Sequence, residues 1–395
     1  MNILYIAHRI PYPPNKGDKL RSFHQICHLS TRHSVHLACL VDDQEDLQHI
    51  RTLEKYCASV DAVYRDKTVA RVLAALALFT NQPLSVASFY SKKLEAKIAR
   101  RLRSQKFDRI FVFSSAMAWY VRDVSHIPKI MDFVDVDSEK WRLYAAYHPF
   151  PRSWIYRLEA NRLAQYEQQV ARIFDHSLFV SEKEADLYKR LATDRPISVI
   201  PNGVDLDYYA PSGNTSSSPN RLVIVFTGSM DYFPNVDAVR YFCKEIFPMI
   251  QAALPEVTFY IVGRNPTRQV KTLGRQRGVI ITGSVSDVRP YLASARVAIA
   301  PFRLARGVQN KVLEAMAMGL PVVGTSQAFQ GIQATLADGI RIADDPKGFA
   351  QEVLTLLKDS EFHRRCSLQA REYVKRCHRW QEHGARLELL LQAIG

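Results

Sequence analysis

Short apolar runs alternate with amphipathic segments of helix length almost from the first residue. In the first half, strands are predicted at Asn2–Ala7, Ser34–Val41, Arg109–Ser114, Lys129–Val134, Ser177–Val180 and Ile197–Ile200. Helical patterns fall between them, at Lys19–Thr31, Lys92–Arg103 and Trp154–Phe174. This alternation is typical of a mostly parallel sheet with helices on both faces.

The same alternation starts again in the second half of the chain. Strands are predicted at Leu222–Thr227, Val257–Val262, Val279–Thr282, Val297–Ala300 and Pro321–Val323. Helices are predicted at Asn235–Ala253, Val308–Met318, Lys347–Lys358 and Glu361–Gln392. The fold class is therefore α/β, with two similar parallel-sheet domains, and the default ligand site is the cleft between them.

A small, polar, proline-bounded segment from Pro211 to Asn220 separates the two halves and has the composition of a linker. The predicted organisation is a first Rossmann-like domain over residues 1–211, a linker over 212–220 and a second Rossmann-like domain over 221–375. Residues 376–395 are predicted to form a terminal helix.

Composition narrows the class of protein. The chain has 395 residues, of which 47% are hydrophobic and 23% charged, as expected of a globular protein of two domains. Its longest apolar run, Val69–Thr80, contains Arg71 and is shorter than the roughly 18 residues of a membrane span. The six cysteines form no CxxC pair, so no metal site is predicted. Without a recognisable leader at the N-terminus, a cytoplasmic location is expected.

The net charge of +14 is unevenly distributed. Residues 64–109 contain eleven Lys or Arg and only three Asp or Glu. Within them, Lys92–Arg103 places Leu94, Ile98 and Leu102 at four-residue steps. One interpretation is a helix lying on an anionic membrane face, which predicts peripheral binding at the inner face of the cell membrane. The other is an ordinary amphipathic helix packed on the sheet. No nucleic-acid-binding module is present, so no nucleic-acid partner is expected.

Several common nucleotide sites are excluded by their missing motifs. The chain lacks G-x-G-x-x-G after its first strand and lacks a P-loop, and neither G-x-S-x-G nor H-E-x-x-H occurs. The first strand leads instead into a proline-rich loop that contains Gly17. A glycine between a strand end and a helix start favours close approach of a ligand to the backbone, although a tight turn alone would also explain it.

The most informative stretch is Pro301–Val323. A helix beginning near Val308 would place four residues on one face, namely Gly307, Lys311, Glu314 and Met318. The other helix positions are almost all apolar, which predicts burial and hence a need for partners around Lys311 and Glu314. The two could pair with each other. Alternatively, Lys311 and the helix N-terminus would hold phosphates while Glu314 accepts hydrogen bonds from sugar hydroxyls.

These stretches carry a family resemblance over nearly the whole chain. The sequence resembles the retaining nucleotide-sugar glycosyltransferases of family 4, which have the two-domain GT-B fold, at Gln309–Val323, Ile200–Asp205, Phe226–Gly228 and Ile261–Arg264. More narrowly, Ala305–Lys311 and Met131–Trp141 resemble the sugar transferases of exosortase/PEP-CTERM exopolysaccharide systems.

The resemblance implies roles for individual residues, and it also shows departures. Glu314 matches the second glutamate of the family's E-x7-E motif, which holds the nucleotide ribose. The first glutamate is replaced by Arg306. Ser229 and Pro234 stand where the family has a basic pair for the phosphates. The predicted catalytic residues are Asp135, Arg306 and Lys311. The predicted substrate-binding residues are Gly17, Gly228, Arg264, Arg303, Gly307, Gln309, Asn310 and Glu314.

The implied reaction is transfer of a sugar from a nucleoside-diphosphate sugar to a saccharide acceptor, which is either free or lipid-linked. The resemblance also implies that residues 1–211 form the acceptor-side domain and residues 221–375 the nucleotide-sugar-binding domain, and that the helix at 376–395 crosses back to the first domain. The resemblance implies retention of configuration, with the leaving diphosphate accepting the proton, and it implies neither a metal nor a cofactor. Asp135 would position a substrate, or else cap the helix that follows it. An epimerase on the same fold and a non-catalytic nucleotide-sugar binder remain the alternatives.

Overall fold

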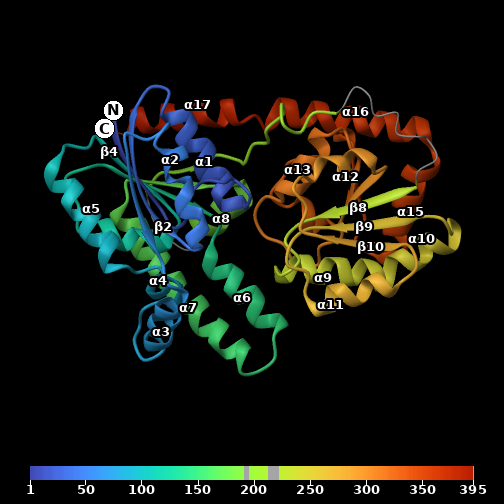
Figure 1. Cartoon of the computed structure of the whole chain (residues 1–395), viewed down its shortest axis with the longest axis horizontal. Helices are drawn as coiled ribbons and strands as arrows, with labels where there is room; N and C mark the ends of the chain where they lie inside the picture. Colours follow the sequence, from blue (N-terminus) through green and yellow to red (C-terminus); the bar gives the residue numbers. More distant parts are fainter. Residues whose placement is uncertain (191–194, 212–221, 395) are drawn as a thin grey trace. The chain divides into compact units, whose positions relative to one another are not determined.

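The computed structural model describes residues 1–190, 195–211 and 222–394, and it divides the chain into two compact units. The first unit contains Met1–Pro201 and Gln381–Gly395, and the second contains Asn202–Trp380 (Figure 1). The chain therefore passes between the units at Pro201 and Trp380, whereas the sequence placed the boundaries at 211 and 375. The predicted linker, 212–220, lies outside the described residues.

The first unit is built on a parallel sheet in the order β3-β2-β1-β4-β5-β6-β7. Its strands are β1 (Asn2–Ala7), β2 (Ser34–Val41), β3 (Ser59–Tyr64), β4 (Arg109–Phe113), β5 (Lys129–Val134), β6 (His176–Phe179) and β7 (Ile197–Val199). Leu4 and Ile6 join one apolar core while Ile3 and Tyr5 join another. The sheet is thus buried on both faces, which is why its strands are continuous apolar runs.

Helices cover both faces of this sheet (Figure 1). They are α1 (Gly17–Leu29), α2 (Ile50–Leu53), α3 (Lys67–Ala77), α4 (Leu84–Ser88), α5 (Lys92–Ser104), α6 (Asp137–Tyr147), α7 (Arg152–Ile173) and α8 (Glu182–Lys189). The terminal helix α17 (Trp380–Ala393) contributes Leu387 and Leu391 to the core of this unit, and both are fully buried.

The second unit repeats the arrangement with six parallel strands in the order β10-β9-β8-β11-β12-β13. They are β8 (Val223–Thr227), β9 (Thr258–Val262), β10 (Val279–Gly283), β11 (Val297–Ala300), β12 (Val322–Gly324) and β13 (Ile340–Ile342). Its helices are α9 (Phe233–Tyr241), α10 (Phe247–Ala253), α11 (Arg268–Lys271), α12 (Arg289–Ser294), α13 (Asn310–Ala317), α14 (Ser326–Phe329), α15 (Pro346–Lys358) and α16 (Ser360–Cys377). The predicted fold class, two Rossmann-like parallel-sheet domains, is confirmed.

The long helix predicted at Glu361–Gln392 is broken in two, between α16 and α17. At the break, His378 Nδ1 forms a 2.8 Å hydrogen bond with the backbone carbonyl of Asn202, and Val204 pairs with Arg379 in a β-bridge. Gly203 lies against the Trp380 ring so closely that a Cβ there would be 2.7 Å from it. These contacts come from a segment nearly 180 residues earlier in the chain, so local periodicity did not reveal the break.

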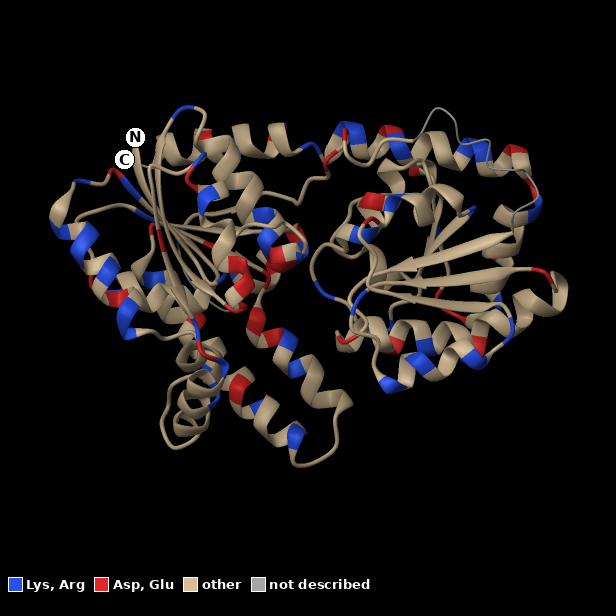
Figure 2. Cartoon of the chain, in the orientation of Figure 1, with Lys and Arg blue, Asp and Glu red and all other residues tan. Residues whose placement is uncertain are grey.

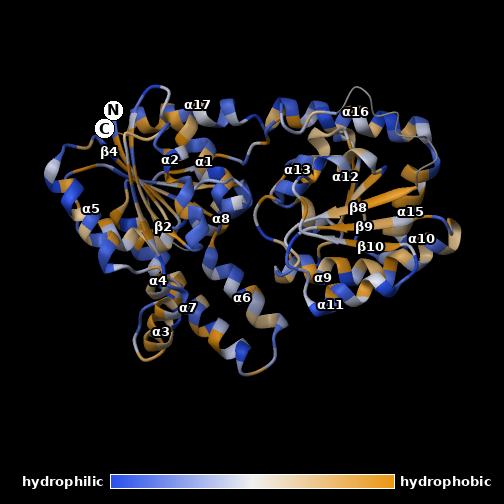
Figure 3. Cartoon of the chain, viewed as in Figure 1, coloured by the Kyte–Doolittle hydropathy of each residue, from blue (hydrophilic) through white to orange (hydrophobic). Residues whose placement is uncertain are grey.

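The hydropathy pattern places apolar residues mainly in the strands and on the inner helix faces (Figure 3). In the described part of the chain, no helix is both long and apolar enough to cross a bilayer. The apolar stripe of α5, for which a membrane-facing surface was one of the two interpretations, is buried: Leu94 and Ile98 are at most 1% exposed, inside the core that also contains Leu4 and Ile6. On the same helix, Arg101 Nε donates to Asp61 at 2.5 Å. The alternative, an ordinary helix packed on the sheet, is therefore correct for α5.

Candidate functional site

The strand order of the second sheet reverses between β8 and β11, and Gly228 follows β8 directly at its carboxyl end. Gly228 has a φ of +154°, and a Cβ there would lie 2.8 Å from Asn235 Nδ2 and 3.0 Å from Lys311 Nζ. A Cβ at Gly263, at the end of β9, would lie 1.6 Å from the Gly228 carbonyl oxygen. Gly263 needs to be glycine because the Gly228 backbone approaches it, and Gly228 because of its positive φ and the nearby side chains of Asn235 and Lys311. The Lys311 amine therefore lies next to this strand end.

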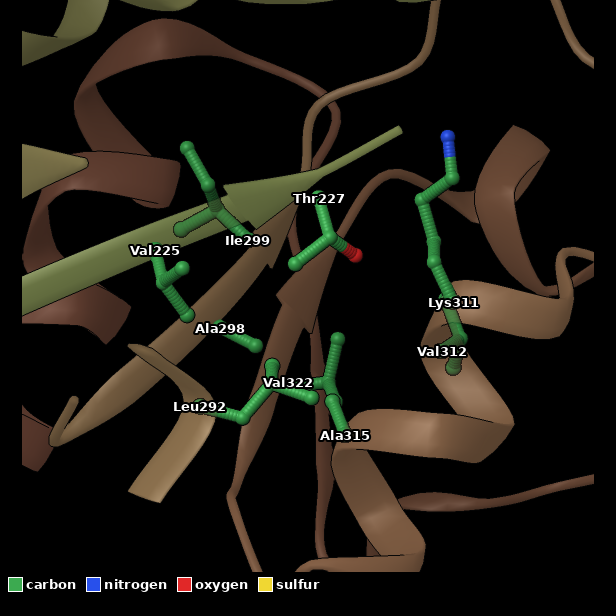
Figure 4. A pocket seen from close by; sticks show the side chains of 9 residues that line it. All are labelled: Val225, Thr227, Leu292, Ala298, Ile299, Lys311, Val312, Ala315 and Val322. Atoms are coloured by element: carbon green, nitrogen blue, oxygen red, sulfur yellow. The ribbon is translucent and has the colours of Figure 1, made fainter. Parts of the chain in front are cut away.

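Lys311 lies in the first turn of α13, whose apolar residues Val312, Leu313 and Ala315 are buried as predicted. Its Nζ donates to Asn235 Oδ1 and lies 4.7 and 4.8 Å from the ring centroids of Phe226 and Phe302. Loss of solvation in these surroundings lowers the pKa of the Lys311 amine to about 7. A small pocket lies beside the helix, and its lining is apolar except for Lys311 and Thr227 (Figure 4).

Glu314 is one turn further along α13. The Tyr209 hydroxyl donates to its carboxylate, and desolvation raises the pKa of Glu314 to about 7, although the charge of Lys311 opposes that shift. Desolvation and the neighbouring carboxylate likewise raise the pKa of Tyr209. Each of the two charged residues therefore has a neutral hydrogen-bond partner. Both partners, Asn235 and Tyr209, are remote from α13 along the chain, so the sequence pattern did not predict them.

The loop before α13 differs from its prediction. The helix begins at Asn310 rather than near Val308, and Gly307 has a φ of +64°, so Gly307 is not on the helix face with Lys311. The Gly307 carbonyl packs tightly against Gly331, where a Cβ would be 2.4 Å from the carbonyl oxygen. Gln309 Nε2 donates to the Arg306 carbonyl at 3.1 Å, and Asn310 Oδ1 accepts from Asn202 Nδ2 at 3.0 Å. The amide side chains thus fix the loop that carries Arg306.

The predicted arginines have different surroundings. Arg303 forms a bidentate ion pair with Asp237 of α9: its Nε donates to Oδ2 at 3.1 Å and its Nη2 donates to Oδ1 at 2.5 Å. This pair holds Arg303 against α9. Arg264 follows Gly263, and its carbonyl accepts from the Met230 amide at 2.8 Å, which joins the loops after β8 and β9. Arg264 is thereby held beside the Gly228 turn.

A polar cluster that was not predicted shapes the loop after β8. Asp231 accepts from Ser229 Oγ at 2.6 Å and from Asn265 Nδ2 at 3.0 Å. Asn235 Nδ2 in turn donates to the Ser229 carbonyl at 2.8 Å. Asn235 therefore connects this loop to Lys311, and the amine is positioned by residues from β8, α9 and α13.

In the first unit, Gly17 is the first residue of α1 and borders a charged cluster at the carboxyl ends of β1 and β2. Asp18 forms hydrogen bonds with both Arg9 and His8 Nε2, the latter at 3.0 Å. Arg9 Nε also donates to Asp42 at 2.6 Å. Burial acts to raise the pKa of Asp18, but His8 and Arg9 hold that pKa well below its usual range. The sequence analysis had singled out only the glycine of this loop.

Asp135 comes directly after β5, next to Val134, which has a φ of +67°. The first amides of α6 are capped by other carboxylates: Val136 N donates to Glu184 at 2.8 Å, and Ser138 N donates to Glu167 at 3.2 Å. Carboxylates from α7 and α8 therefore bond to the amides at the start of α6, and both interpretations of Asp135, substrate positioning and helix capping, stay predictions.

The groups gathered around α13 suit an anion that carries hydroxyls. An amine, a partly buried carboxylate, a phenol and the backbone of a glycine turn meet at the carboxyl end of a central parallel strand, where ligands of open α/β sheets bind. Within the described residues, no group of three or more His, Cys, Asp or Glu side chains is placed to hold a metal ion. Donor binding without a metal stays a prediction.

Comparison with protein families assigns both halves of the chain. Residues 24–208 match the family described as Glycosyltransferase Family 4, and residues 221–359 match the family described as Glycosyl transferases group 1. Together these two matches span most of the chain, and the gap between them contains the predicted linker.

Individual relatives are more distant. An uncharacterized 44.6 kDa protein in the cps region of Klebsiella pneumoniae is 21% identical over 373 residues, covering 90% of this chain and 91% of that protein. The sucrose-phosphate synthase of Thermosynechococcus elongatus superimposes with a TM-score of 0.73 at 15% identity, covering 99% of this chain and 98% of that one. The structure of Anabaena Alr3699/HepE in complex with UDP and glucose superimposes with a TM-score of 0.70 at 15% identity, and the match covers all of both chains.

Proposed function

We propose that the chain, whose first half matches Glycosyltransferase Family 4 and whose second half matches Glycosyl transferases group 1, is a GT-B glycosyltransferase that transfers a sugar from a nucleoside-diphosphate sugar to a saccharide acceptor. The donor would bind to the second unit and the acceptor to the first. The relative from a cps region and the resemblance to exopolysaccharide enzymes support a role in cell-surface polysaccharide assembly at the inner face of the cell membrane.

One observation carries the donor assignment: Lys311 and Glu314 occupy successive turns of α13 beside the Gly228 turn. A cation and a carboxylate held in apolar surroundings are costly unless a ligand or a partner compensates them. Here Lys311 would contact the diphosphate, and Glu314 would accept hydrogen bonds from the ribose hydroxyls. The backbone at Gly228 would come close to the phosphates because no side chain intervenes.

For the reaction we propose retention of configuration. The bond between the sugar C1 and the diphosphate oxygen breaks, the acceptor oxygen bonds to C1, and the leaving diphosphate takes the acceptor's proton. Lys311, together with Arg306 in place of the usual glutamate, would neutralise charge on the diphosphate, with Arg264 close to the same turn. Asp135 would position a substrate from the first unit. Preorganised charge and orientation are then the main contributions of the protein.

The test is a panel of donors with the intact protein. UDP-glucose, GDP-mannose and related donors are each titrated by calorimetry, and those that bind are incubated with p-nitrophenyl glycosides with or without EDTA. We expect one nucleotide to bind, a glycosylated product to form and the new anomeric signal in the NMR spectrum to match that of the donor. Release of an epimerised sugar without acceptor would instead show the epimerase, and tight binding without any turnover would show the non-catalytic binder.

The pH dependence of nucleotide binding follows from the two perturbed pKa values. A bound diphosphate stabilises the charged amine and so raises the pKa of Lys311 from about 7, which means that binding above pH 7 takes up a proton. Ribose hydroxyls stabilise the carboxylate and lower the pKa of Glu314 from about 7, so binding below pH 7 releases a proton. Affinity for the nucleotide should therefore be highest near neutral pH and fall on both sides.

Calorimetry in two buffers of different ionisation enthalpy measures both effects. The uptake at pH 8.5 should disappear in Lys311→Ala, and the release at pH 5.5 should disappear in Glu314→Ala. Proton exchange that is unchanged in both variants would contradict the assignment of these groups to the ligand.

A further inference from the structure

Apolar side chains are exposed on one face of α3 and at the tip of the hairpin formed by α6 and α7. On α3 and just after it, Val69, Val72, Leu76 and Phe79 recur at helical spacing, and each is more than half exposed. At the hairpin tip, Tyr147, Phe150 and Trp154 are also more than half exposed. Phe79 and Phe150 are 88% and 80% exposed. We call these seven residues the apolar face.

The two parts of the apolar face belong to one region of the first unit. Arg162 of α7 donates to the carbonyl of Ala77 at 2.8 Å, which fixes the end of α3 against α7. Glu159 of α7 accepts from the backbone amide of Ser85 at 2.9 Å and so anchors α4 as well. Trp154 lies eight residues before Arg162, or about 12 Å along the same helix. Figure 1 shows α3 and the hairpin projecting together from the first unit.

Positive charges predominate in the segments that carry the apolar face. Segments 67–89 and 140–158 contain six Lys or Arg and neither Asp nor Glu (Figure 2). Three of the six are paired: Lys67 with Asp43, Lys140 with Asp137 and Arg142 with Glu139. Among the described residues, the other three, Arg71, Arg152 and Arg157, form no ion pair. Their charge is available to an anionic partner.

We propose that this apolar face docks the first unit on an anionic lipid bilayer. Aromatic rings and aliphatic side chains between arginines match the boundary between lipid headgroups and acyl chains. A second copy fits less well, since a two-fold contact would place arginine against arginine. The basic residues of α5 could contribute only electrostatic attraction to the lipid surface, because the apolar stripe of that helix is buried. The membrane contact expected within 64–109 thus moves from α5 to α3.

The test uses the intact protein with vesicles of phosphatidylglycerol and phosphatidylcholine, or of phosphatidylcholine alone, separated by sedimentation. Binding should require the anionic lipid and weaken with salt. Leu76→Ser/Phe79→Ser and Phe150→Ser/Trp154→Ser should each lower the partition coefficient about tenfold. Leu368→Ser/Leu389→Ser is the matched control, since these leucines are equally exposed elsewhere, and it should bind like the wild type. Circular dichroism checks that all variants are folded.

A second readout follows the insertion itself. Vesicles should shift the tryptophan emission to shorter wavelength, and Trp154→Phe should abolish most of that shift. Wild-type binding by both apolar variants would overturn the proposal. So would a loss of binding that occurs in Lys92→Gln/Lys93→Gln but in neither apolar variant. So would a dimer in sedimentation velocity that the apolar variants dissociate. Vesicle binding needs no turnover, so failure here would leave the proposed sugar transfer untouched.

Discussion

Lys311→Ala and Glu314→Ala should each weaken binding of the cognate nucleoside diphosphate by about 10- to 150-fold. The estimate corresponds to about 1.5 to 3 kcal/mol, the usual range for a charge-assisted hydrogen bond. Lys311 lies beside the Gly228 turn and Glu314 one turn away, so each variant removes a different part of the proposed site. Isothermal titration calorimetry at pH 7 measures both losses.

Matched controls separate this effect from a general change in charge or folding. Lys271→Ala and Glu256→Ala remove the same charges from exposed positions of the same unit and should leave nucleotide affinity unchanged. Both site variants should also melt cooperatively, because water can solvate the partly exposed positions that they vacate. Wild-type affinity in a folded Lys311→Ala or Glu314→Ala would show that the pair is structural and not part of a donor site.

Asp132→Ala should lower the free energy of unfolding of the first unit by about 3 to 5 kcal/mol, the usual cost of leaving a buried ionic partner alone. Asp132 is fully buried, and Arg21 is 1% exposed. Asp132 accepts from Arg21 at 2.8 and 3.2 Å and from Gln25 at 2.7 Å. Without the carboxylate, the guanidinium loses its acidic partner, although it retains the 2.7 Å hydrogen bond to the Ile200 carbonyl. Urea denaturation followed by circular dichroism gives the value.

The double variant Arg21→Met/Asp132→Leu shows whether the loss comes from the stranded charge. It should recover much of the stability, since apolar groups of similar volume can replace a buried ion pair. Asp123→Ala, which breaks an exposed pair with Arg122, should cost less than about 1 kcal/mol. A small effect of Asp132→Ala would contradict the assignment of Asp132 as a structural residue, in contrast to Asp135, for which a substrate-positioning role is proposed.

The sequence by itself determined the two parallel-sheet domains and many strand limits. Asn2–Ala7, Ser34–Val41, Lys129–Val134 and Val297–Ala300 are strands at the predicted residues. The reason is that a strand buried on both faces is a continuous apolar run, so the ends of the run mark the ends of the strand. The edge strands Ser59–Tyr64 and Ile340–Ile342 were not predicted, because their burial is incomplete and their runs are weaker.

Lys311 and Glu314 were also recognised from the sequence, because two charged residues in an otherwise apolar helix form a local pattern. Only the tertiary structure decided their surroundings: Asn235 and Tyr209 come from other elements, and Arg303 is held by Asp237. The amphipathic pattern of α5 was read correctly as a helix, but it left open whether the apolar stripe meets a membrane or the sheet, and the packing of Leu94 and Ile98 decided for the sheet. Periodicity tells which face of a helix is apolar, whereas the chain's long-range packing decides whether that face meets a sheet or is left exposed, as it is on α3.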